Sequence, residues 1–140
     1  MAYIATIQEF GSTGKNHNIP PRPFMRPVFK KNLTNYKDIT QSLILDNDKS
    51  ASDIAELLGA RIMGDMQLSI AEVYTPPLSK ITLAMRYLRE QNKAGFRGSK
   101  GLVESLRRQL DSDTPPKLST NTKPLNDSGL MLASVQYKVD

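Results

Sequence analysis

The sequence contains no cysteine and only one histidine. Without cysteine the chain can form neither a disulfide bond nor a thiolate metal site, so it does not need an oxidising compartment. The single histidine, His17, lies in a loop of polar residues, and we expect it to be an ordinary surface residue. The sequence therefore predicts no metal site.

Motifs that mark enzymes are also missing. The chain has no phosphate-binding loop of the Walker type, no GxGxxG and no HExxH. The GSTG segment at 11–14 lacks the Lys-Ser/Thr ending of a phosphate loop, and Ser128 lacks the first glycine of a GxSxG elbow. We therefore expect no catalytic residue, no cofactor site and no enzyme activity.

Apolar residues are scarce, at 39% of the chain, and no apolar run approaches the ~18 residues that a membrane span needs. The N-terminal residues lack the basic start of a signal peptide, and we expect a soluble protein made in a cytoplasm. The 140 residues suit one domain, 1–140, with a modest core. A thin core combined with nine prolines and eight glycines is typical of a subunit that completes its stability against neighbours.

Helical periodicity is strongest at 51–74, where apolar residues recur every four positions from Ile54 to Ile70. Ser50 is a natural N-cap for this helix, with Asp53 three residues later as the second half of a capping box. Shorter helices are predicted at 24–32, 34–45, 79–93 and 102–110.

Strands are predicted at both ends of the chain. Residues 2–10 are rich in residues that favour extended structure, although a helical ending at 7–10 is the alternative. Apolar and polar residues alternate at 135–139, as in a half-buried strand. The predicted fold class is therefore α+β: a small antiparallel sheet packed against a long amphipathic helix, plus shorter helices and long loops. The loops are expected at 11–22, 94–101 and 111–123.

Positive charge is concentrated in two stretches of a chain whose net charge is +5. Residues 15–37 contain six basic and no acidic residues, and residues 80–108 contain eight basic and two acidic residues. Either these stretches form a solvated mixed surface, or they face DNA through phosphate contacts without reading bases. The channel-facing or DNA-facing candidates are Lys30, Lys31, Arg86, Arg89, Lys93, Arg97, Lys100, Arg107 and Arg108.

Four prolines fall within ten residues at 18–27, NIPPRPFMRP. This stiff segment loses little entropy on ordering, which suits a docking edge. Its arginines could make forked contacts with a neighbour's carboxylates. The alternative is an intramolecular brace in which Phe24 fills the core, and the two roles can coexist. The subunit-interface or docking candidates are Pro20, Pro21, Arg22, Pro23, Phe24 and Arg26.

Four segments together resemble one family. They are IQEFG at 7–11, NIPPRPFMRP at 18–27, TPPLSKITLAMR at 75–86 and KPLNDSGLMLASVQYKV at 123–139. In this order they are similar to the virion morphogenesis proteins of tailed bacteriophages, also described as neck, tail-completion or head–tail joining proteins. Many of those proteins carry further sequence before the first segment. This chain is then either a short member or one that lacks a helix and a strand.

The resemblance implies a structural virion protein rather than an enzyme. It implies a homo-oligomeric ring, expected to be hexameric, at the head–tail junction of a virion assembled in the host cytoplasm. The partners would be neighbouring neck, connector and tail proteins, with non-specific contact to genomic DNA in the channel and no membrane. The alternative function is a basic nucleic-acid-binding or scaffolding accessory protein of phage assembly.

Overall fold

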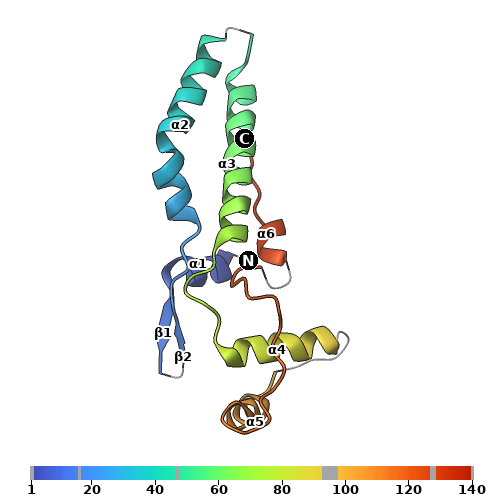
Figure 1. Ribbon diagram of the computed structural model, residues 1–140. Coiled ribbons are helices and arrows are strands. Elements are labelled where there is room, and N and C mark those ends of the chain that lie inside the picture. The colour runs from blue at the N-terminus through green and yellow to red at the C-terminus, as the bar shows by residue number, and fades with distance from the viewer. Residues whose placement is uncertain (1, 16, 47, 93–97, 127–128, 140) are drawn as a thin grey trace.

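The computed structural model describes residues 2–15, 17–46, 48–92, 98–126 and 129–139. Most of this part of the chain is helical, and its two strands form one small antiparallel sheet, so the predicted α+β class is confirmed (Figure 1). The elements in chain order are α1 (Ala2–Phe10), β1 (Ser12–Gly14), β2 (His17–Ile19), α2 (Met25–Leu45), α3 (Ala51–Glu72), α4 (Lys80–Gln91), α5 (Lys100–Leu110) and α6 (Leu130–Ala133).

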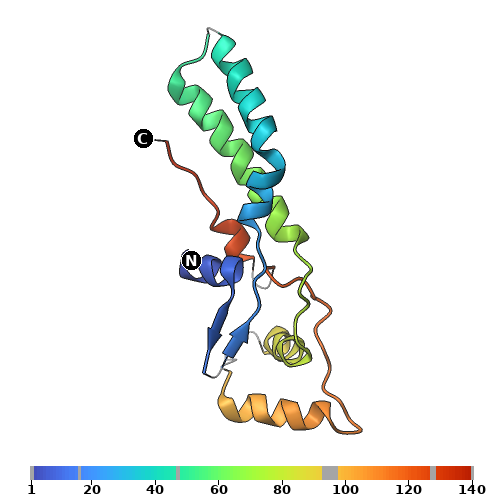
Figure 2. The same cartoon turned by 90° about the vertical axis from the view of Figure 1, so that its left-hand side faces the viewer.

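Helices α2 and α3 form a long hairpin that projects from the rest of the molecule (Figure 1, Figure 2). Helix α3 begins as predicted, with a capping box in which the Ser50 hydroxyl accepts from the Asp53 amide at 3.2 Å. The Asp53 carboxylate accepts from the Ser50 amide at 3.0 Å. Across the hairpin, the Tyr36 hydroxyl donates to the Asp65 carboxylate at 2.8 Å, which fixes the pairing of the two helices.

Helix α2 is continuous, so the prediction of two separate helices at 24–32 and 34–45 is wrong. Pro27 lies in the first turn, where an amide hydrogen would have no acceptor within the helix, so its absence in proline costs no hydrogen bond. No proline or glycine follows it before the helix ends at Leu45. No helix-breaking residue therefore interrupts α2 after residue 32.

The predicted strand at 2–10 is also wrong, because these residues form α1. The Thr6 hydroxyl donates to the Ala2 carbonyl at 3.0 Å, a bond that only helical geometry allows at this spacing. Gly11 ends the helix with a φ of 77°, in the left-handed region that glycine adopts without strain. The helical alternative, considered only for 7–10, holds for the whole segment.

The sheet lies where a loop was predicted. Strands β1 and β2 pair Ser12 with Ile19 and Gly14 with His17, inside the 11–22 segment. The predicted strand at 135–139 is wrong, because no strand is present among those residues. This segment contacts α3 instead: a Cβ on Gly59 would lie 2.5 Å from the Tyr137 ring.

Helices α4 and α5 lie at the end of the molecule opposite the hairpin tip (Figure 2). Ser79 caps α4 as a hydroxyl acceptor for the Thr82 amide at 3.2 Å, and Ser99 caps α5 in the same way. Helix α5 begins at Lys100, inside the predicted 94–101 loop, half of which lies outside the described residues. None of the described helices combines the length and apolarity that crossing a bilayer requires.

The hydrophobic core is small and lies where the hairpin meets the rest of the chain. Its buried members are Phe24, Ile70 and Leu125, against which residues of α1 and α6 pack. The chain exposes 10096 Å² of surface. A compact monomer of the same 15.6 kDa exposes about 7,300 Å². The fold therefore leaves much more surface uncovered than a self-contained domain does.

Candidate functional site

The segment 20–26 leads into the base of the hairpin, where Glu9 of α1 caps the N-terminus of α2. The Glu9 carboxylate accepts from the amides of Phe24, Met25 and Arg26, at 2.7, 2.9 and 3.1 Å. Its side chain is only 2% exposed. Burial alone would raise the pKa of Glu9, but the three amides and the Arg26 guanidinium together lower it below its ordinary value. Glu9 is therefore held as a carboxylate, and it fixes α1 across the base of α2.

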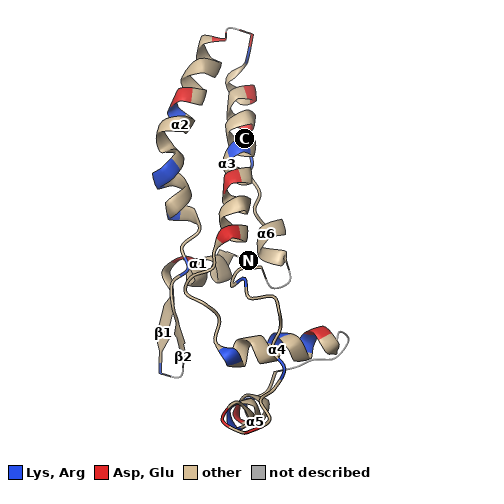
Figure 3. Cartoon of the chain, viewed as in Figure 1, with Lys and Arg blue, Asp and Glu red and all other residues tan. Residues whose placement is uncertain are grey.

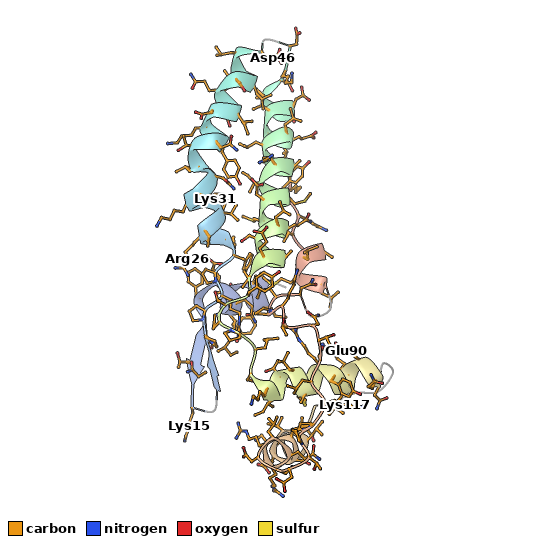
Figure 4. All side chains as sticks on the ribbon, viewed as in Figure 1. Lys15, Arg26, Lys31, Asp46, Glu90 and Lys117 are labelled. Carbon is orange, nitrogen blue, oxygen red and sulfur yellow. The ribbon has the colours of Figure 1, made fainter. Side chains whose placement is uncertain are left out.

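Arg26 completes this junction from the solvent side. Its Nε donates to the Glu9 carboxylate at 3.0 Å, and its Nη2 donates to the Glu9 carbonyl at 3.0 Å. The guanidinium also lies over the Phe10 ring, 4.8 Å from the ring centre. Arg26 stands at the foot of α2 beside α1 (Figure 4). Its side chain is 60% exposed, so it keeps surface that a neighbour can contact.

Arg22 and Phe24, two of the docking candidates, are used inside the chain. Phe24 is 3% exposed in the core. The Arg22 guanidinium is also buried and donates to the carbonyls of Pro76 and Pro77, at 3.0 and 3.4 Å. The segment thus acts as the intramolecular brace that was the alternative to docking. Among the candidates, Pro21 and Arg26 remain exposed, and Pro20 and Pro23 are half-buried.

Arg86, predicted to face a channel or DNA, is a buried brace. It is 5% exposed, and its guanidinium donates to the carbonyls of Asn121, Lys123 and Pro124 at 2.9, 2.9 and 3.2 Å. It therefore fastens the loop that follows α5 to α4. Burial, and then the positive charge of Arg86, lower the pKa of Arg22, because the two guanidinium groups share one region of the fold. That region is a cavity of about 900 Å³.

The other basic candidates do not gather on one surface. Basic residues are spread over α2, α4 and α5, while acidic residues follow α3 (Figure 3). Glu104 lies one turn along α5 from Lys100, so the face of this helix carries both charges. Lys93 and Arg97 lie outside the described residues. The exposed candidates are Lys30 and Lys31 on α2, Arg89 on α4, and Lys100, Arg107 and Arg108 on α5.

An apolar groove between α2 and α3 was not predicted. It has a volume of about 490 Å³ and runs along the hairpin from Phe29 to Ile44. Its largest exposed side chains include Leu33, which is 51% exposed, and Ile44, which is 61% exposed. Phe29, Leu33, Tyr36, Thr40 and Ile44 recur every three or four residues. This stripe becomes visible in the sequence only when 25–45 is treated as one helix.

A second apolar surface lies on α1. Tyr3 is 77% exposed and Phe10 is 63% exposed, and seven residues place both on the same side of a helix. Aromatic side chains exposed on one side of a helix are candidates for contact with another protein. Within the described residues there is no group of three or more side chains suited to hold a metal ion.

Comparisons of the chain with family models, curated proteins and solved structures find no match. The resemblance to phage virion morphogenesis proteins therefore depends on the four sequence segments. Two of those segments contribute to the junction at the hairpin base: 7–11 supplies Glu9, and 18–27 supplies Arg22, Phe24 and Arg26.

Proposed function

We propose that this chain is a structural subunit of a tailed-phage virion that forms a homo-oligomeric ring at the head–tail junction. In this role it completes the neck or the tail, allows head and tail to join, and continues the passage for DNA. The ring is expected to be hexameric, with connector and tail proteins as neighbours. The phage context comes from the sequence resemblance, and the physical support comes from the surface of the fold.

The observation that carries the proposal is the excess of exposed surface. The 10096 Å² exposed by the chain exceeds that of a compact monomer of its mass by about 2,800 Å². The excess includes large apolar side chains at the hairpin tip, where Ile44 and Leu45 are 61% and 74% exposed. A ring subunit covers such surfaces with its neighbours on either side.

The fold suits assembly because its contact surfaces are mounted on a stiff base. Glu9 ties α1 to the foot of the hairpin, Arg22 ties the proline segment to the 76–77 segment that follows α3, and Arg86 ties the loop after α5 to α4. The groove and the aromatic face of α1 are therefore presented at fixed angles. Surfaces that are already ordered lose less entropy when subunits associate.

Loss of the chain during infection is the first test. An amber codon at Gln8 in the encoding phage gene should cause DNA-filled heads and finished tails to accumulate separately in a non-suppressing host. A suppressor strain that inserts glutamine should restore joined particles. Electron microscopy of the lysates scores both. A normal yield of infectious, joined particles without suppression would contradict the neck role.

The alternative function, a basic nucleic-acid-binding or scaffolding accessory protein, ranks second. Its candidate residues form a poor surface for binding nucleic acid. Arg86 is buried, and the α5 face includes Glu104 among its basic residues. Neutralisation of phosphates supplies most of non-specific nucleic-acid binding, and it requires accessible cations. The same amber strain separates the two functions. A nucleic-acid-binding or scaffolding role predicts heads that are empty or malformed, whereas a neck role predicts full heads.

A further inference from the structure

The groove on the α2–α3 hairpin is formed by this chain but is not filled by it. Leu33 and Ile44 stand half or more exposed along its length, and Leu58 and Ile62 of α3 form the opposite wall. Among the described residues, Lys37 is the one charged residue in the lining. The groove runs along sixteen residues of α2, from Phe29 to Ile44, or about 24 Å of helix. The groove therefore has room for a short apolar helix.

Helix α1 has the matching properties. Its nine residues are about 13.5 Å long, so it fits within the length of the groove. Its aromatic residues Tyr3 and Phe10 lie about 10.5 Å apart along one side of the helix. Its single charged residue, Glu9, is buried against α2, and the Arg26 guanidinium lies over the Phe10 ring, which still is 63% exposed. A helix with apolar anchors at i and i+7 is the ordinary occupant of an apolar groove.

We propose that α1 of one copy docks in the α2–α3 groove of the next copy, with Tyr3 and Phe10 as its anchors. This inference rests on the proposed function, because it names the contact that closes the ring. The helix cannot fill the groove of its own chain. The bonds from Glu9 to the amides of Phe24 and Met25 hold α1 across the foot of the hairpin.

The contact is head-to-tail when each copy gives α1 to one neighbour and its groove to the other, whereas in a two-fold pair the same two copies would exchange both contacts. Head-to-tail contacts generate rings when the rotation between copies closes. A standard interface takes about 800 Å² from each partner, so two such contacts cover about 1,600 Å² per copy. That area is within the excess surface of the chain. A groove-to-groove contact would instead pair two hairpins and stop at a dimer.

Cross-linking between single-cysteine variants tests the contact, since the chain has no cysteine of its own. The Tyr3→Cys and Leu33→Cys variants, each with a different tag, are co-expressed as full chains and treated with a short bis-maleimide. Both positions are more than half exposed, so the substitutions leave the core intact. The control replaces Leu33→Cys with Leu68→Cys, which is 60% exposed on α3 but outside the groove.

A cross-linked dimer carrying both tags in the Tyr3–Leu33 mixture, and its loss in the Tyr3–Leu68 mixture, is the expected result. Two outcomes overturn the proposal: no doubly tagged dimer above the Leu68 control, or a dimer that Leu33→Cys forms with itself alone. The amber test is independent. If the cross-link fails while heads and tails still accumulate separately, the neck function stands and only this contact is wrong. If the cross-link forms but heads and tails join normally in the amber strain without suppression, the contact stands and the neck function is wrong.

Discussion

The Glu9→Ala variant is expected to lose about 3 kcal/mol of its free energy of unfolding, more than an ordinary helix cap provides. The substitution leaves the amides of Phe24 and Met25 without their acceptor and removes the partner of the Arg26 guanidinium. The Phe24 amide is buried, so water cannot fully replace the carboxylate. Both α1 and the start of α2 should loosen together.

Urea unfolding followed by far-ultraviolet circular dichroism measures this loss. Glu56→Ala is the matched control, because Glu56 is exposed on α3 and no cap depends on it. We expect the control to unfold within ~0.5 kcal/mol of the parent chain. Equal stability of the Glu9→Ala variant and the control would show that the cap does not hold the hairpin base.

The same carboxylate makes stability depend on pH. The pKa of Glu9 in the folded chain is lowered from its ordinary value of 4.5 by the amides and by Arg26, against the effect of burial. The stabilising contribution is therefore present above pH 4.5 and is lost as pH falls through the lowered folded pKa. Comparing the free energy of unfolding of the parent with that of Glu9→Gln, whose side chain does not titrate, isolates the pH-dependent contribution of Glu9. Parallel loss of stability in both chains below pH 4.5 would assign the acid sensitivity to other groups.

The Arg86→Ala variant of the parent chain is expected to lose ~3 kcal/mol of its free energy of unfolding, because buried hydrogen bonds of α4 are lost. Its guanidinium is the donor for the carbonyls of Asn121, Lys123 and Pro124, in a buried region beside α4. Removing it leaves these acceptors without their donor and releases the loop that follows α5. Arg86→Lys should restore little of the lost stability, because one ammonium group cannot reproduce a planar guanidinium that reaches three carbonyls.

Hydrogen exchange locates the effect. Amides in 118–126 should lose protection in the Arg86→Ala variant, while those in the α2–α3 hairpin keep theirs. Arg107→Ala is the control, since Arg107 is an exposed arginine of the same predicted basic set. Unchanged stability in Arg86→Ala, with a change only in nucleic-acid binding, would return Arg86 to the role the sequence suggested.

Local signals predicted the parts of the fold that depend on local chemistry. Ser50 with Asp53 marks the start of α3 because a hydroxyl or carboxylate beside free amides is favourable in any context. The periodicity from Ile54 to Ile70 predicts α3 because an apolar stripe has to be buried. The α+β class is correct, but it was based on strands predicted at 2–10 and 135–139, whereas the sheet pairs Ser12–Gly14 with His17–Ile19.

The rest depends on contacts between distant segments. Residues 2–10 favour extended structure by composition, but Glu9 must reach the start of α2, and that contact is made from a helix. Arg22 and Arg86 look like surface cations in sequence, yet each meets carbonyls more than thirty residues away. The groove was missed because one helix was taken as two. The apolar stripe from Phe29 to Ile44 crosses the supposed break.

Imaging the head–tail junction of intact particles by cryo-electron microscopy tests the central claim most directly. We expect a closed ring of copies at the junction, in which the α2–α3 hairpin of each copy contacts its neighbour. A mature junction that contains no copy of this chain would contradict the permanent neck assignment. It would favour a scaffolding or nucleic-acid-binding role instead.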